Sequence, residues 1–409
     1  MKPSKRGGRN PKRAKHHKQE KPTSRCMSSR YRELGVDVEK RGIEAFKGLI
    51  RGLYPNAFCV IHRDPSDPSM GLVLHTDSAG SKPIQAYLHW RETGDPRWFR
   101  GLAQDVVAMN LDDIICVGAW PTAFVDYIAF NTLHIDREAL LSEMAKGFEE
   151  VFTTLEKLGV DILFSGGETA DLPDQLRTLD ISGAILGRVP LNRVVTGDAI
   201  RPGDLIVGLR SGGKASYEGE RNSGIMCNGL TLARCSLMKA EYVEKYPELT
   251  HPAGERYRGR YSFDEYLEEL DMTVGEALLS PTRLYAPIIL RVLKELPEGV
   301  HGLIHNTGGG LTKCMRVGRG ILYVKDSLPE PDPIFRLIQR EGHVDWSEMY
   351  RVFNMGVGFE VIVESGYADD VIDIAEAYGV EAQIIGICEH GPEGNGVRID
   401  SSYGRFLYP

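Results

Sequence analysis

Apolar and polar positions in the first half of the chain follow two different periods. Short apolar runs predict strands at 70–77, 122–130, 160–165 and 179–189. Apolar residues at helical spacing predict helices at 38–53, 100–118 and 136–158, the last with Asp136 as its N-cap. We also expect a Gly-Gly turn at 166–167, after the third strand. This half therefore interleaves strands with helices.

The same pattern restarts after a segment rich in Pro and Gly at 190–203, which predicts a domain boundary. Beyond it we expect strands at 204–209, 300–305, 320–325, 357–363 and 381–388, the last of which closes the chain. Helices are expected from Leu230 onward, at 282–296 and at 367–379. The charged, Tyr-rich segment 241–272 is predicted to be an excursion from the core.

A length of 409 residues agrees with roughly two to three domains. Both halves place strands and helices in alternating order, which favours α/β and α+β domains over an all-helical or all-strand fold. We therefore predict a disordered tail at 1–26, one domain at 27–195 and a second domain at 196–409.

Composition excludes several classes of protein. Hydrophobic residues make up 42% and charged residues 26%, which excludes a wholly disordered chain, collagen and a coiled coil. No apolar run approaches the roughly 18 residues of a membrane span, and the N-terminus lacks the apolar core of a secretory signal. The seven cysteines form no C-x-x-C pair, and Cys116 and Cys388 are predicted core residues. We expect a cytoplasmic protein in a reducing environment.

The net charge of −8 combines a basic tail with an acidic body. Residues 1–26 hold ten Lys or Arg residues and a single acid, Glu20, so the tail carries +9 and the remainder −17. Such a tail cannot bury enough apolar surface to fold alone. We interpret it as a disordered appendage, or as an extension before a start at Met27; the alternative is an RNA-binding arm. The acidic body argues against nucleic acid as the main partner.

Two apparent motifs fail on their chemistry. Residues 208–215 nearly match a P-loop, but Ala215 replaces the Ser or Thr whose hydroxyl binds Mg²⁺. His301 and His305 are four apart like a zincin pair, but their segment is predicted to be a strand, on which such residues lie about 13 Å apart. A zinc ion needs both histidines within about 2.1 Å, so we reject this site.

Acids at the ends of predicted elements are the remaining candidates. Asp77 ends a strand and precedes a loop of small residues, whose open N–H groups together with Lys82 suit a phosphate. Asp105 and Asp113 are eight residues apart on one helix, about 80° around its axis, so both can flank one groove.

Glu168, beside Thr169, follows the expected Gly-Gly turn at another strand end. Hard carboxylate ligands favour Mg²⁺, which bridges nucleotide phosphates. Each acid taken alone is more often a helix cap or a solvated residue, but their clustering makes a functional role an equal alternative. The residues alone thus predict an enzyme that uses Mg²⁺ and a nucleotide, with the substrate left open.

Eight strings occur in the order and spacing of one family. They are YRELGVDVEK (31–40), HTDSAGSK (75–82), QDVVAMNLDD (104–113), VGAWP (117–121), GGETADLPD (166–174), SPTRLYAP (280–287), HNTGGG (305–310) and EMYRVFNMGVGF (348–359). The sequence resembles the phosphoribosylformylglycinamidine cyclo-ligases, also called aminoimidazole ribonucleotide synthetases. The resemblance covers residues 29–390.

The resemblance implies a fold and a reaction. The fold is an N-terminal α/β domain and a C-terminal α+β domain, in a homodimer whose N-terminal sheets form a barrel. In the reaction, ATP activates the formyl amide oxygen of formylglycinamidine ribonucleotide. The amidine nitrogen then attacks that carbon and closes the imidazole ring, with release of ADP and phosphate. The nucleotide lies in a cleft and is not held by a P-loop.

The resemblance also implies roles for residues. The set facing ATP and Mg²⁺ comprises Asp77, Lys82, Asp105, Asp113, Glu168 and Thr169. Within it, Asp77, Asp105 and Glu168 are expected to bind the metal. The catalytic set comprises His305, Asp77 and Lys82. The set facing the substrate comprises Asn228, Gly229, His305, Thr307, Gly308, Gly309 and Asn354, with Gly356 in the same stretch as the last.

Other readings stay open because residues 54–69 and 210–227 depart from the family pattern. One alternative is another ATP-using member of the superfamily, such as a selenophosphate synthetase, a thiamine-monophosphate kinase or a hydrogenase-maturation dehydratase. Cys59 lacks the Gly-rich loop expected around a reactive selenophosphate synthetase cysteine. A second alternative is a non-catalytic protein that binds RNA through the basic tail.

Overall fold

The structure is a computed structural model that describes residues 29–36, 42–46, 48–252, 254, 256–391 and 394–409. The predicted disordered tail at 1–26 lies outside these residues. No helix in the described ranges is both long and apolar enough to cross a bilayer.

The first half of the chain forms a five-stranded sheet in the order β1-β2-β5-β3-β4. Its strands are β1 (Ile61–Arg63), β2 (Met70–Ser78), β3 (Trp120–Phe130), β4 (Leu163–Asp171) and β5 (Leu179–Pro190). Neighbours are antiparallel except β3 and β4, which are parallel. Buried residues alternate with half-buried ones along β5, so one face of this sheet packs against the core. The strands expected at 70–77, 122–130 and 179–189 are confirmed.

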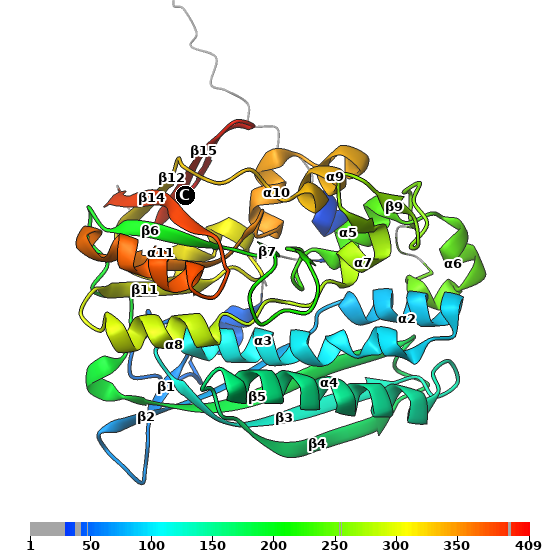
Figure 1. The fold of residues 1–409 in the computed structure, drawn as a ribbon, viewed down its shortest axis with the longest axis horizontal. Helices are drawn as coiled ribbons and strands as arrows, with labels where there is room; N and C mark the ends of the chain where they lie inside the picture. Colours follow the sequence, from blue (N-terminus) through cyan, green and yellow to red (C-terminus); the bar gives the residue numbers. More distant parts are fainter. Residues whose placement is uncertain (1–28, 37–41, 47, 253, 255, 392–393) are drawn as a thin grey trace, which may run out of the picture.

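Helices cover one face of this first sheet, as Figure 1 shows. They are α2 (Lys82–Thr93), α3 (Gly101–Ile115) and α4 (Arg137–Lys157). Asp136 caps α4 by accepting a hydrogen bond from the backbone N–H of Ala139, as the sequence predicts. Nearly every residue of α3 is buried, because α4 packs on one side of it and the C-terminal half of the chain on the other.

The second half forms a seven-stranded sheet in the order β11-β13-β6-β14-β12-β15-β16. Its strands are β6 (Leu205–Arg210), β11 (Val300–His305), β12 (Ile321–Lys325), β13 (Val357–Val363), β14 (Ala382–His390), β15 (Gly396–Ser401) and β16 (Gly404–Tyr408). The expectation that 381–388 closes the chain is therefore wrong. After β14 the chain returns as β15, parallel to β12, and β16 completes the edge.

Helices of the second half pack around this sheet and beside α2. They are α5 (Leu230–Leu237), α6 (Glu241–Lys245), α7 (Val274–Leu279), α8 (Ala286–Glu295), α9 (Pro333–Gly342), α10 (Trp346–Val352) and α11 (Ala368–Glu376). Two short hairpins also form: β7 (Gly212–Gly213) with β8 (Asn222–Ser223), and β9 (Tyr266–Leu267) with β10 (Met272–Thr273). The segment 241–272 packs on the body, where Glu248 accepts hydrogen bonds from Tyr87 and Arg91 of α2.

Two predicted elements differ in the structure. The helix expected at 38–53 is only a 3₁₀ turn, Ile43–Phe46, within the described residues, and its apolar side chains are exposed. Two glycines, Gly48 and Gly52, interrupt the helical spacing that follows. The expected turn at 166–167 is part of β4, because Gly166 adopts a left-handed φ of 82° and absorbs a register shift against β3 without ending the strand.

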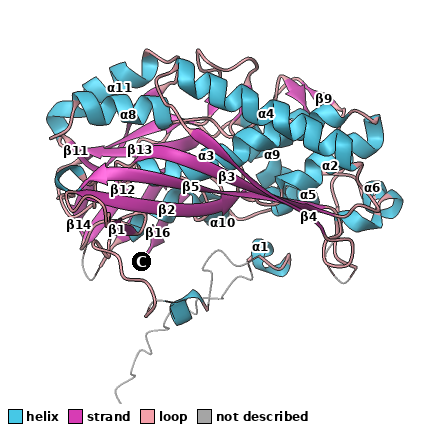
Figure 2. Ribbon diagram, turned by 90° about the horizontal axis from the view of Figure 1, so that it is seen from below, coloured by secondary structure: helices cyan, strands magenta, loops and turns pink. Residues whose placement is uncertain are grey.

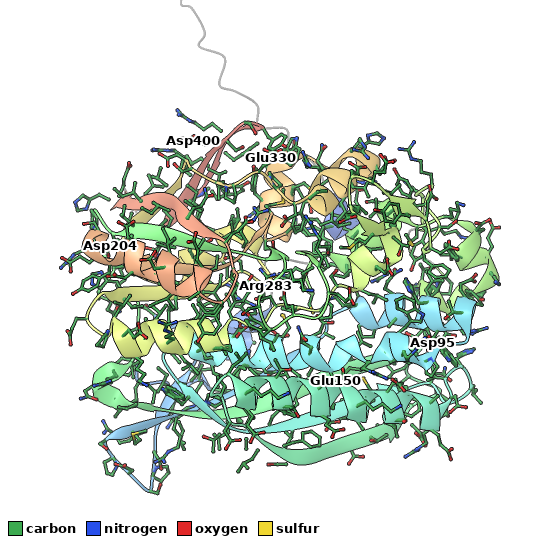
Figure 3. The ribbon with its side chains drawn as sticks, in the orientation of Figure 1. Asp95, Glu150, Asp204, Arg283, Glu330 and Asp400 are labelled. Carbon is green, nitrogen blue, oxygen red and sulfur yellow. The ribbon has the colours of Figure 1, made fainter. Side chains whose placement is uncertain are left out.

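Buried charges join the loops at the centre of the molecule. Arg283, labelled near the middle of Figure 3, pairs with Glu218 at 2.7 Å and donates to the carbonyl oxygens of Arg210 and Gly212. Its side chain is 1% exposed. The labelled acids Asp95 and Asp400 lie nearer the periphery of the same view. The Arg283 contacts fix the loop that follows β6 against the segment that leads into α8.

Candidate functional site

A cavity of about 470 Å³, hereafter the central cavity, is lined by both halves of the chain. The first half contributes the end of β2, the loop that follows it and two residues of α3. The second half contributes the start of α5, the loop after β11 and the 3₁₀ segment Gly310–Arg316. Tyr31 and Val36, from the N-terminal segment, complete the wall.

Asp113 lies at the centre of a charged cluster on the wall of this cavity. Its Oδ1 is 2.8 Å from Nδ1 of His305, and its Oδ2 is 3.4 Å from Nε2 of His75 and 3.7 Å from Nζ of Lys313. Burial alone would raise the pKa of Asp113. Lys313 and the two histidines outweigh burial and hold this pKa well below its usual value, so Asp113 is a carboxylate at neutral pH.

Asp77 supplies a second carboxylate two residues beyond His75 on β2. Its backbone N–H donates to Asn110 Oδ1 at 2.9 Å, which fixes the end of β2 against α3. Burial and the neighbouring Asp113 raise the pKa of Asp77. His75, Asp77 and Asp113 each offer one ligand atom within 4.8 Å of the others, so the described residues bring two carboxylates and an imidazole together.

His305 lies behind Asp113 and does not line the cavity. Its side chain is fully buried beside Tyr285 and Phe359, and burial lowers its pKa although Asp113 opposes this. Direct contact between His305 and a ligand, as expected, therefore needs correction: the imidazole reaches the cavity only through Asp113. The loop that follows does reach the cavity, through Thr307 and Gly308.

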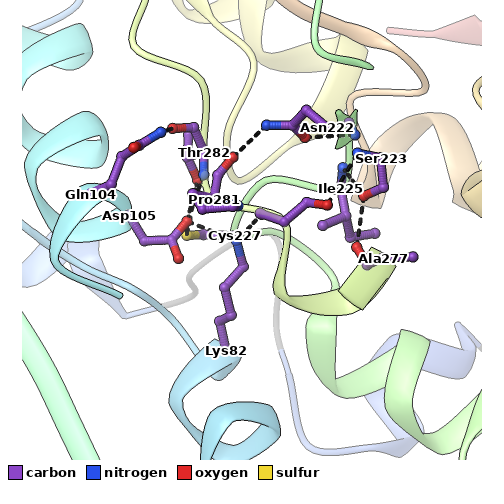
Figure 4. A network of polar contacts seen from close by, with 12 residues as sticks. Lys82, Gln104, Asp105, Asn222, Ser223, Ile225, Cys227, Ala277, Pro281 and Thr282 are labelled. Carbon is purple, nitrogen blue, oxygen red and sulfur yellow. Dashed lines mark hydrogen bonds and ion pairs between the residues drawn. The ribbon is translucent and has the colours of Figure 1, made fainter. Parts of the chain in front are cut away.

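Lys82 and Asp105 form a closed cluster away from the cavity wall. Lys82 Nζ donates to Asp105 Oδ1 at 2.7 Å and to the carbonyl oxygen of Ser280 at 2.6 Å. Figure 4 shows Lys82 pointing toward Asp105. Asp105 Oδ1 also accepts from the N–H and the hydroxyl of Thr282 at 2.8 and 2.7 Å. Lys82 and Asp105 are both 0% exposed, and Cys227 separates Asp105 from the cavity. Lys82 and Asp105 therefore do not line the central cavity, and their role toward ATP stays a prediction.

The expected metal set of Asp77, Asp105 and Glu168 does not converge. Asp105 faces α2 and the 280–282 segment, where Lys82 neutralises it. Glu168 is exposed on β4, the edge strand, with β5 and β3 between it and β2. Thr169 lies next to it on that strand, equally far from the cavity. The residues that do converge with Asp77 are His75 and Asp113.

Only some of the residues expected to face the substrate line the cavity. Asn228, Thr307 and Gly308 line the cavity. Gly229 instead begins α5 with a φ of 69°, and a Cβ there would overlap the ring of Phe353.

Asn354 is buried, 1% exposed, and does not line the cavity. Its amide accepts from Ser211 Oγ and the Gly356 N–H and donates to the carbonyl of Gly224, so it joins three loops. Gly309 has a φ of 107° and starts the 3₁₀ segment after the cavity loop. Asn354 and Gly309 therefore fix the loops around the cavity but do not line it.

His75, Lys313 and Tyr31 were missed as site residues. A signal existed for His75, since residues two apart on a strand share a face and Asp77 was already a candidate. Lys313 had no comparable signal, because the loop that carries it reaches Asp113 only in the folded chain.

The two halves of the chain match sequence models of the two domains of one known family. The sequence model of the AIR synthase related protein N-terminal domain matches residues 56–189, and that of the C-terminal domain matches residues 201–398. The chain belongs to the AIR synthase related protein family. The fold class expected from the sequence, an α/β and α+β pair of this family, is confirmed.

Curated relatives in this family share about a third of their residues with the chain. A phosphoribosylformylglycinamidine cyclo-ligase of Methanocaldococcus jannaschii is 38% identical over 328 residues, covering 80% of this chain and 81% of the relative. A protein of the same name from Methanothermobacter thermautotrophicus is 37% identical over 325 residues, covering 79% and 82%.

Solved structures of other proteins share the fold. The thiamine monophosphate kinase of Aquifex aeolicus has a TM-score of 0.52 at 13% identity, covering 89% of this chain and 97% of that chain. At this identity the likeness shows the fold alone.

Proposed function

We propose that this protein is an ATP-dependent ligase that closes the imidazole ring of aminoimidazole ribonucleotide, from formylglycinamidine ribonucleotide, with release of ADP and phosphate. The observation that carries the proposal is the cyclo-ligase name shared by relatives that match four fifths of the chain at up to 38% identity. The central cavity supports it, because carboxylates and cations there suit phosphoryl transfer.

Mg²⁺ fits the His75, Asp77 and Asp113 cluster. Two carboxylates with an imidazole form a mainly hard donor set. Burial and the neighbouring Asp113 raise the pKa of Asp77, and a bound cation would favour its charged form. When bound, the ion neutralises the phosphate oxygens of ATP during transfer. We propose Asp77 and Asp113 as the main holders of this ion.

The cations of the cavity complement the phosphate groups of both substrates. Lys313 and Arg316 both line the cavity. The Nζ of Lys313 lies 3.7 Å from Asp113 Oδ2, and Lys313 also contacts the hydroxyl of Thr307. Phosphoryl transfer depends mainly on alignment and charge neutralisation, which such groups provide. Asn228, Thr307 and Gly308 present polar groups that orient the formylglycinamidine.

His305 acts in this proposal by orienting Asp113. Its Nδ1 holds one carboxylate oxygen at 2.8 Å, so the other oxygen is directed toward His75 and Lys313. The Lys82–Asp105 pair supports the site from behind by fixing α2 and α3 to the segment at 280–282.

We also propose a cytosolic homodimer that forms through the first sheet. Figure 1 shows α3 and α4 above this sheet, and the view from below in Figure 2 shows its strands from the other side. Large apolar side chains are exposed on these strands: Leu74, Trp120, Val125, Tyr127, Leu163 and Phe164. Exposed apolar area of this kind is typical of an interface, and light scattering after size exclusion tests the dimer.

A substrate panel tests the proposed reaction. The purified full chain is given ATP and Mg²⁺ with formylglycinamidine ribonucleotide, selenide or thiamine monophosphate in turn. We expect ADP release above background, together with aminoimidazole product, only with the first. ADP release with either of the other two, and none with formylglycinamidine ribonucleotide, would assign the chain to a different activity in the superfamily.

A further inference from the structure

The N-terminal segment at 29–36 lies across the central cavity. It carries the short helix α1 (Arg30–Glu33), from which Tyr31 faces the cavity, and ends at Val36, which also lines it. In Figure 2, α1 lies at the periphery, beside α5 and α10. Four residues are too few for a helix to be stable by itself, and α1 has no fully buried residue.

One carboxylate from the second half of the chain holds this segment. Glu348, in the first turn of α10, accepts from Ser29 Oγ at 2.5 Å and from the Tyr31 N–H at 2.9 Å through Oε1. Its Oε2 accepts from the Arg30 N–H at 3.1 Å. The first N–H groups of any helix lack partners within it, and here Glu348 satisfies two of them.

Further hydrogen bonds within residues 29–36 connect the start of this segment to its end. Ser29 Oγ also accepts from the Arg32 N–H at 3.2 Å, and the Val36 N–H donates to the Tyr31 carbonyl at 3.2 Å. Glu348 thus fixes the start of a connected turn whose other end lies at the cavity. The half-buried position of Glu348 makes these charge-assisted bonds stronger than bonds in water.

We propose that Glu348 is a positioning residue for the ring-closing reaction, since it holds residues 29–36 as the cavity wall that keeps water from the activated intermediate. This inference rests on the proposed function. The γ-phosphoryl group of ATP is transferred to the formyl amide oxygen, which breaks its bond to the ADP oxygen, while the amide nitrogen loses its proton. The amidine nitrogen then forms the ring C–N bond and loses a proton, while the C–O bond to phosphate breaks and phosphate leaves.

Water can attack the same carbon in an open cavity. The C–O bond to phosphate then breaks in favour of the oxygen of water, which regenerates the formyl amide and releases phosphate. ATP is consumed without product. A wall that excludes water therefore affects the ratio of ADP to aminoimidazole, which a merely structural residue would not change.

The test compares Glu348→Ala and Glu348→Gln with Glu376→Ala, a matched control on the exposed face of α11. We expect Glu348→Ala to raise KM for formylglycinamidine ribonucleotide about tenfold or more, with kcat kept within about threefold. ADP should exceed aminoimidazole, and amide hydrogen exchange at residues 30–32 should accelerate. Glu348→Gln should be intermediate, because it replaces one acceptor oxygen with a donor facing the Arg30 N–H.

A second variant guards against loss of folding. Tyr31→Ala removes a cavity-lining ring from a segment with no fully buried residue, and should reproduce the KM increase and the excess of ADP. Unchanged KM, coupling and exchange in Glu348→Ala, or unchanged KM and coupling in Tyr31→Ala, would overturn the inference. A wild-type chain that makes no aminoimidazole overturns the proposed function instead, while the exchange rates still decide whether Glu348 holds the segment.

Discussion

Two aspartates on α3 have opposite surroundings. Asp105 is sealed against Lys82, Thr282 and Cys227, and every neighbour belongs to the protein. Asp113 also has a lysine near it, but at 3.7 Å, and it shares a cavity wall with the carboxylate of Asp77. One end of α3 thus carries a closed ion pair and the other an open cluster.

The difference assigns the closed pair a structural role and the open cluster a role in binding the substrates. In the closed pair the charges are compensated inside the fold, so the pair has little capacity to bind a ligand. In the open cluster, burial and repulsion by Asp113 both raise the pKa of Asp77, and a bound cation can offset both effects. A site kept in this state costs stability in the free protein and gains it on binding.

The largest expected effect on stability comes from opening the closed pair. Lys82→Met leaves Asp105 buried without its partner, and we expect the free energy of unfolding to fall by about 3–5 kcal/mol. Chemical denaturation measures the change. Lys146→Met, which removes a half-exposed partner of Glu143, is the control and should cost less than about 1 kcal/mol. If Lys82→Met lowered the free energy of unfolding no more than the control, the Lys82–Asp105 pair would not stabilise the fold.

The open cluster should respond in the opposite way. Asp77→Asn removes one of two repelling charges, so the unfolding free energy should stay the same or rise. Turnover should fall by about 10²-fold or more, because the ion and the phosphates lose a holder. Parallel denaturation and steady-state assays measure both. A variant that is less stable yet fully active would contradict the division between the two regions.

Ligand binding sharpens the comparison further. Mg²⁺ with ATP at about a hundred times Kd should stabilise the wild-type chain by about 2.7 kcal/mol. Asp77→Asn should lose most of this stabilisation, and thermal scans with and without ligand measure it. Equal stabilisation of both proteins would place the nucleotide and its ion away from the open cluster.

Two glycines provide the smallest contrast. Gly229→Ala should cost about 1–3 kcal/mol, because its φ is 69° and a Cβ would overlap Phe353. Gly308→Ala meets no atom within 4 Å and should change the unfolding free energy by less than about 0.5 kcal/mol. Its effect should appear in KM, since Gly308 lines the cavity. Equal losses of stability would remove the distinction between the two positions.

Periodicity predicted the central strands and helices because each has one face against a core. This holds for β2, β5 and α4, whose apolar positions recur at the period of the element. It failed at 38–53, where the described large apolar residues have helical spacing but are exposed, namely Ile43, Phe46, Leu49, Ile50 and Leu53. It did not predict β15 and β16, although buried and half-buried residues alternate from Val397 to Asp400 in β15.

The site was only partly predictable, since helix geometry gives relative directions and not neighbours. Helix spacing predicted that Asp105 and Asp113 could flank one groove, but only Asp113 lines the cavity. Nothing local in the sequence showed that Lys82 would pair with Asp105 and bury it. Asp77, Asp113, Asn228 and Thr307, which the family resemblance implied as site residues, do line the cavity. Glu348 could not be found from the sequence, because its partners at 29–31 are more than 300 residues away.

The most direct test of the central claim is the ratio of aminoimidazole ribonucleotide to ADP formed by the wild-type chain with formylglycinamidine ribonucleotide, ATP and Mg²⁺. The account predicts equal amounts of the two products, and loss of both in Asp77→Asn. Aminoimidazole formation that persists in Asp77→Asn at the wild-type rate, or ADP without any aminoimidazole from the wild type, would contradict it.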